Sequence, residues 1–128
     1  MNHIKSYKLF ENVNGALYST KEIINYIKGI SQTPETDVPD YYFSLMKKES
    51  PKFSLQRLSV NGILEKDKSV HEYVMSGEDR YEDSYYEPST EELYDPIVIY
   101  KGEVIDGYNR LGTLYRLGEK EVDAYVSI

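Results

Sequence analysis

The chain has 128 residues, the size of one domain, and this length can bury a hydrophobic core without disulfides. It contains no cysteine and two histidines, His3 and His71, which excludes a disulfide, a cysteine nucleophile and a histidine-rich metal site. It has 22 acidic and 15 basic residues. Its apolar runs are too short for a membrane-spanning helix or a signal peptide, so we expect a cytoplasmic protein without membrane contact.

The first part of the chain, residues 1–50, predicts helices that are added to a core formed by the rest. Ser19 and Glu22 have the spacing of a capping box, and isoleucines recur at helical spacing after them. A helix is therefore predicted over about residues 20–30. A loop with two prolines follows, and Tyr41–Lys48 predicts a second, shorter helix.

The middle of the chain predicts one strand and one helix. Phe53–Val60 has imperfect strand alternation, and the Asn61–Gly62 pair after it is typical of a turn. Ser69 and Glu72 form another capping box, and Gly77 fits the end of the helix that they would begin.

The segment Glu78–Asp95 contains eight acids and one base, Arg80, so it accounts for the whole net charge of −7. The other residues balance at 14 acids and 14 bases, and they lack the basic surface of proteins that bind nucleic acid directly. Such a charged run is most often a solvated loop. The alternative is an interface for a basic protein partner. Its expected residues are Tyr81, Asp83, Tyr85, Tyr86 and Glu87.

The last third of the chain has the clearest pattern of elements. The predicted order is a strand Ile97–Tyr100, a tight turn at Lys101–Gly102, a return strand Glu103–Asp106, a helix Tyr108–Leu117 ended by Gly118, and a strand Val122–Val126. The mixed order of strands and helices along the chain predicts a single domain over residues 1–128. Its class is α+β (α/β-like), a small mixed sheet with packed helices.

The strand-to-helix junction at Gly107 is the best candidate for a ligand site. A helix start exposes unpaired N–H groups with partial positive charge, and glycine lets a ligand approach the backbone closely. Arg110 adds a guanidinium in the first turn, and Asp106 has the chemistry to bind Mg²⁺ or accept a proton. The structural alternative is a junction whose Asp-Gly only turns the chain and whose Arg only pairs.

Asp95–Gly112 and Leu117–Val122 resemble the ParB/sulfiredoxin superfamily. The shared pattern is an apolar strand after proline, a turn, a strand ending in (Asp)-Gly-x-x-Arg, a helix, and Leu-Gly before a closing strand. The clear resemblance covers about the last quarter of the chain. Phe53–Val60 and the helix after it match the superfamily more weakly, and residues 1–50 match no family. The resemblance implies a ParB/sulfiredoxin-like core over residues 53–128.

That resemblance implies a site for a nucleoside triphosphate, ATP or CTP, bound reversibly with Mg²⁺. The residues implied to bind it are Gly107, Tyr108, Asn109 and Arg110. Asp106 beside them is the implied catalytic or Mg²⁺-binding carboxylate. Glu65 and Asp67 follow the first strand of the motif, where the superfamily can place a catalytic carboxylate, and Glu65 is the second catalytic candidate.

Departures from the superfamily pattern exclude some of the activities known in the superfamily. Sulfiredoxin has its catalytic cysteine where this chain has Tyr108, so sulfinic-acid reduction is excluded. Many members have histidine where this chain has Asn109, which cannot act as a general acid or base. The partition proteins carry a following helix-turn-helix domain that these residues lack, so we do not expect DNA partitioning from this chain alone. A phosphotransferase or NTP hydrolase remains, and the alternative is a non-enzymatic interaction module or inhibitor that uses the acidic loop.

Overall fold

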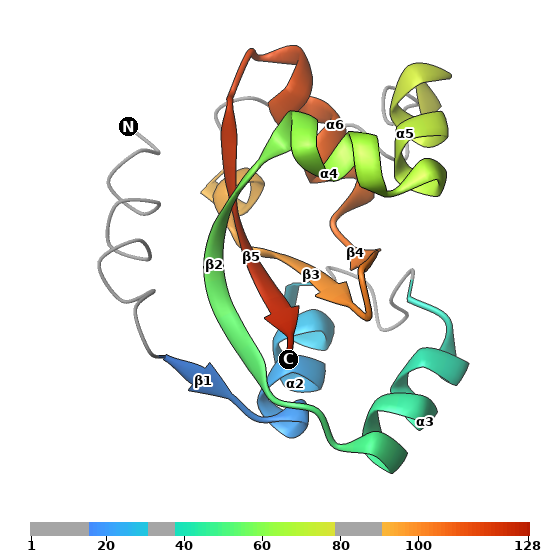
Figure 1. Cartoon of the computed structure of the whole chain (residues 1–128), viewed down its shortest axis with the longest axis vertical. Helices are drawn as coiled ribbons and strands as arrows, with labels where there is room; N and C mark the ends of the chain where they lie inside the picture. The colour runs from blue at the N-terminus through green and yellow to red at the C-terminus, as the bar shows by residue number, and fades with distance from the viewer. Residues whose placement is uncertain (1–15, 31–37, 79–90) are drawn as a thin grey trace.

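The computed structural model shows an α+β fold built on one mixed sheet (Figure 1). It describes residues 16–30, 38–78 and 91–128. The strands are β1 (Leu17–Tyr18), β2 (Phe53–Ser59), β3 (Ile97–Tyr100), β4 (Glu103–Asp106) and β5 (Glu121–Ser127). The helices are α2 (Thr20–Ile30), α3 (Asp40–Glu49), α4 (Val60–Lys66), α5 (Lys68–Met75) and α6 (Tyr108–Arg116), with a 3₁₀ turn η2 (Glu91–Tyr94). The predicted fold class is confirmed.

The sheet has five strands in the order β1-β2-β5-β3-β4. The long strands β2 and β5 pair antiparallel from Phe53↔Ser127 to Ser59↔Glu121. β3 runs parallel to β5 and antiparallel to β4. Because a parallel pair needs a crossover connection, the chain returns from β4 to β5 through α6. This crossover places the start of α6 at the end of β4, an edge strand of the sheet.

Helices cover both faces of the sheet, and β3 shows why. Ile97 and Ile99 belong to the core under α4, α5 and α6, whereas Val98 and Tyr100 belong to the core under α2 and α3. All four side chains are buried, as alternation on a strand covered on both sides requires. α2 and α3 therefore form a full layer of the fold (Figure 1), where the sequence predicts only an addition to a finished core.

Several helix ends form as the sequence predicts. The N–H of Ser19 donates to Glu22 Oε1 and the N–H of Glu22 donates to Ser19 Oγ, both at 3.1 Å. At the end of α6, Gly118 has φ +80° and the N–H of Glu119 bonds the Leu114 carbonyl at 3.0 Å. Among the helices in the described ranges, none is long and apolar enough to cross a bilayer.

Two local predictions in the middle of the chain are wrong. The Asn61–Gly62 pair does not turn the chain but lies in the first turn of α4, where the Ser59 hydroxyl accepts from the Gly62 N–H at 3.0 Å. The cap of α5 is Asp67 and not Ser69. In both places a capping side chain lies just upstream. Ser59 begins a helix where a turn was predicted, and Asp67 begins α5 before Ser69.

Asp67 joins α5 to the edge of the sheet. Its Oδ1 accepts from the N–H groups of Ser69 at 3.1 Å and Val70 at 3.3 Å, and its Oδ2 accepts from the Val104 N–H at 2.8 Å. The residue is buried. One carboxylate therefore caps a helix and occupies a backbone donor of the edge strand β4.

Asp67→Ala should lower the free energy of unfolding by about 3 kcal/mol, because it leaves three backbone donors without their acceptor, two of them buried. Urea unfolding measures the change. Ser59→Ala is the matched control, since Ser59 caps α4 with a single hydrogen bond, and it should cost about 1 kcal/mol. Equal losses in the two variants would contradict the bridging role of Asp67.

Candidate functional site: the junction between β4 and α6

The junction turns at Gly107, between the end of β4 and the start of α6. Gly107 has φ +108° and ψ +18°, and within the described chain no side chain caps the helix that follows. A Cβ at this position would lie 2.4 Å from Ile97 Cγ2 and 3.1 Å from Arg110 Nη2. Glycine is required here both by its left-handed conformation and by the close approach of β3.

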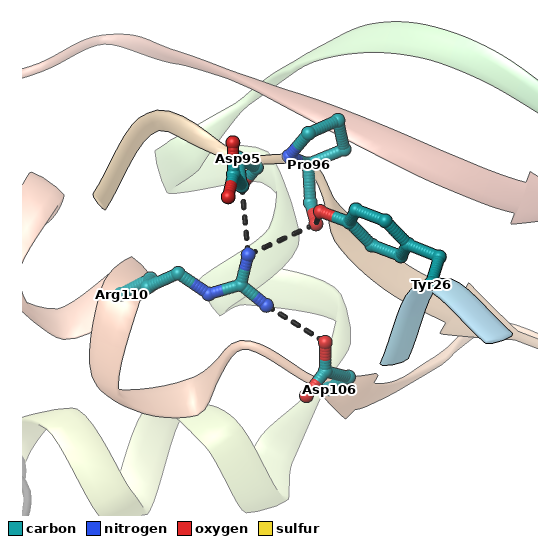
Figure 2. A network of polar contacts seen from close by, with 5 residues as sticks. All are labelled: Tyr26, Asp95, Pro96, Asp106 and Arg110. Carbon is teal, nitrogen blue, oxygen red and sulfur yellow. Dashed lines mark hydrogen bonds and ion pairs between the residues drawn. The ribbon is translucent and has the colours of Figure 1, made fainter. Parts of the chain in front are cut away.

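Arg110 lies beneath the junction and does not extend into solvent, since only 2% of the residue is exposed. Its Nη1 donates to the carbonyl oxygens of Asp95 at 2.9 Å and Pro96 at 3.1 Å, and its Nη2 donates to Asp106 Oδ2 at 2.7 Å (Figure 2). The expected phosphate ligand is thus an internal link between α6, β4 and the segment before β3.

Tyr26 adds α2 to this network. Its hydroxyl donates to the Pro96 carbonyl, which also accepts from Arg110 (Figure 2). Burial raises the pKa of Tyr26, and the nearby Arg110 guanidinium opposes this shift only in part, so the phenol stays neutral. The sequence did not predict this role for Tyr26. The available signal was a tyrosine, with its polar hydroxyl, on the apolar face of the helix between Ile23 and Ile27.

Asp106, the expected catalytic or Mg²⁺-binding carboxylate, is the ion-pair partner of Arg110. Its side chain is 16% exposed, whereas that of Arg110 is 2% exposed. No cluster of three or more histidine or carboxylate ligands occurs in the part of the chain that the structure describes. Asp106 therefore balances a buried cation at this junction.

The outer surface of the junction carries Tyr108 and Asn109, which are partly buried. The Tyr73 hydroxyl of α5 donates to Asn109 Oδ1, and the Tyr73 and Tyr108 rings meet edge to face with centroids 5.2 Å apart. Burial raises the pKa of Tyr108, and the carboxylates of Asp67 and Glu103 raise it further. The tertiary structure thus brings Tyr73 of α5 to the site, a contact that the sequence did not predict.

The remaining predicted residues lie elsewhere. Glu65 is exposed on α4, while Asp67, two residues further on, is buried and bonded to β4. Of these two carboxylates, Asp67 is the one that lies near the junction, where its charge acts on Tyr108. The five predicted partner-binding residues of the acidic loop, 81, 83 and 85–87, lie outside the described residues.

Comparison with known proteins adds no relative. A scan of the sequence against protein-family models finds no match. Searches of curated proteins and of solved structures also find none. The resemblance to the ParB/sulfiredoxin superfamily therefore stays a prediction.

Gly107→Ala should lower the free energy of unfolding by about 3 kcal/mol, since it adds a clash with Ile97 to the strain of a positive φ. Gly118→Ala is the control, because Gly118 has φ +80° but open space around its Cα, and it should cost about 1 kcal/mol. Denaturant unfolding compares the two. A Gly107→Ala loss no larger than that of the control would show that the close contact with β3 is unimportant.

The free energy of unfolding should fall above pH 10, and ionisation of Tyr125 should cause part of this fall. The Tyr125 ring packs against Tyr18 and Tyr26. Burial, followed by neighbouring Tyr18, raises the pKa of Tyr125 to about 12. The stabilisation is complete below the unfolded pKa of about 10 and is lost as pH rises to 12, because the unfolded chain ionises first. Urea unfolding from pH 9 to 12 should show a shallower decline for Tyr125→Phe than for exposed Tyr41→Phe.

Proposed function

We propose that the β4–α6 junction binds the phosphates of a nucleoside triphosphate, ATP or CTP, as its Mg²⁺ complex. The chain would act as a phosphotransferase or NTP hydrolase of the ParB/sulfiredoxin type. The observation that supports this best is the left-handed Gly107 before α6, a helix start without a side-chain cap, inside an Asp-Gly-x-x-Arg sequence. Backbone donors at such a helix start favour anions.

Asn109 supplies a further donor on the same turn of helix. Because the Tyr73 hydroxyl occupies its Oδ1, the amide nitrogen with its two protons is the end that remains for a ligand. Tyr108 beside it offers a partly exposed ring with a neutral hydroxyl. These groups can hold and orient a phosphate, and Asn109 does not act in proton transfer.

Arg110 contributes from below the loop. Its Nη2 lies 3.1 Å from the position that a Cβ of Gly107 would occupy, so the guanidinium is directly under the junction. A cation at this distance raises the local electrostatic potential. In this proposal the backbone and Asn109 contact the phosphate, and Arg110 attracts it from beneath the junction.

Asn109→Asp tests the proposal. The new carboxylate keeps an acceptor for the Tyr73 hydroxyl but repels phosphate, so affinity for the nucleotide should fall by about tenfold or more. A thermal-shift screen with ATP, CTP, GTP and ADP plus Mg²⁺ identifies the nucleotide, and calorimetric titration measures the affinity.

Asn61→Asp is the matched control, because it makes the same charge change at an exposed position of α4 and should leave affinity unchanged. If no nucleotide at millimolar concentration stabilises the wild-type protein, the proposed function is wrong.

The second candidate is a non-enzymatic interaction module that binds a basic protein partner. It is favoured by the internal engagement of Arg110, and by the placement of the whole net charge of −7 in Glu78–Asp95. This function does not require the junction to bind anything. A wild-type protein that ignores every nucleotide would therefore leave it as the better proposal.

A further inference from the structure

We propose that Asp106 is an internal competitor that masks Arg110 from the phosphate ligand. This inference rests on the proposed function, since it concerns the regulation of the same junction. In sequence, Asp106 looks like a catalytic or metal-binding group. In the structure, however, the Asp106 carboxylate is paired with the Arg110 guanidinium. Asp106 therefore weakens the binding of an anion at the junction, because it occupies the cation that would attract the anion.

The two terminal nitrogens of the Arg110 guanidinium face different surroundings. Nη1 is directed at the neutral carbonyl oxygens of Asp95 and Pro96, whose positions the backbone fixes. Nη2 is directed at the Asp106 carboxylate and is also the nitrogen closest to Gly107. Figure 2 shows the contact between Arg110 and Asp106. The carboxylate therefore occupies the nitrogen that is closest to the junction.

Exposure places the carboxylate on the outer side of this ion pair. The Asp106 side chain is 16% exposed and that of Arg110 is 2% exposed. An anion that approaches from solvent therefore meets a negative group before the guanidinium, and the two like charges repel each other. Binding becomes stronger when Asp106 moves away or loses its charge, and the ion pair sets the affinity of the resting protein.

Asp106→Asn tests this inference, because it removes the negative charge of the side chain and keeps its hydrogen bond to Arg110. The amide oxygen still accepts from Arg110 Nη2, so the buried guanidinium keeps its partner, but the negative charge is removed. Affinity for inorganic phosphate without Mg²⁺ should rise by about tenfold, and affinity for ATP with Mg²⁺ should rise with it. Calorimetric titration at fixed ionic strength measures both.

Asp123→Asn is the matched control. Asp123 is buried and pairs with the partly buried Arg57 at 3.0 Å. The substitution therefore removes the same charge from another Arg–Asp pair, between β2 and β5. Its affinity for phosphate and ATP should equal that of the wild type.

The outcomes distinguish this inference from the proposed function. A wild type that binds nucleotide while Asp106→Asn binds it equally or more weakly overturns the masking and leaves the nucleotide site standing. Binding by Asp106→Asn alone supports the masking and shows that the wild-type protein lacks the proposed nucleotide-binding function. No binding by either protein overturns both.

A measurement on the wild type keeps the inference testable if Asp106→Asn fails to fold. The Arg110 guanidinium resonances in NMR spectra should shift when inorganic phosphate or ATP with Mg²⁺ saturates the protein, because the ligand changes the pairing of Nη2. Resonances that stay fixed at saturation would overturn the masking.

Discussion

The buried guanidinium of Arg110 imposes the constraint on which the rest of the structure depends. A charge removed from water must find hydrogen-bond acceptors in fixed positions, and removing one of them leaves an uncompensated cation. The carbonyl oxygens of Asp95 and Pro96 and the carboxylate of Asp106 meet this need. The segment before β3, the end of β4 and the start of α6 are thereby held together. Tyr26 extends the same network to α2 through the Pro96 carbonyl.

At the junction, the hydrophobic core of the sheet also contacts the hydrogen-bond network around Arg110. Ile97 of β3 packs under Gly107, so the sheet approaches the backbone of the turn directly. On the outer side, Asp67 ties α5 to β4 and Tyr73 ties α5 to Asn109. Groups from α2, α5, β3, β4 and α6 therefore converge on a few residues. A change at the junction therefore affects packing and hydrogen bonds in several elements at once.

Much of the last third of the chain could be predicted from local signals. The strands Ile97–Tyr100 and Glu103–Asp106 have the predicted bounds, and the turn at Lys101–Gly102 has the positive φ values that a tight hairpin needs. These elements depend on residue alternation and on glycine, which are properties of neighbouring residues. The middle of the chain was predicted less well. Ser59 caps α4 where a turn was predicted, and Asp67 begins α5 before the predicted Ser69.

The sequence by itself therefore determined the class of fold, the helix-and-strand order of its second half and the position of the junction, because each rests on contacts between residues close in the chain. Only the tertiary structure decided which way the charged groups of the junction point. Arg110 turns inward because carbonyl groups 14 and 15 residues away reach it, and Tyr26 joins them from 70 residues before Pro96. The layer formed by α2 and α3 was likewise decided by burial against β3. No local pattern encodes such long-range hydrogen bonds and packing, since they exist only once the sheet has assembled.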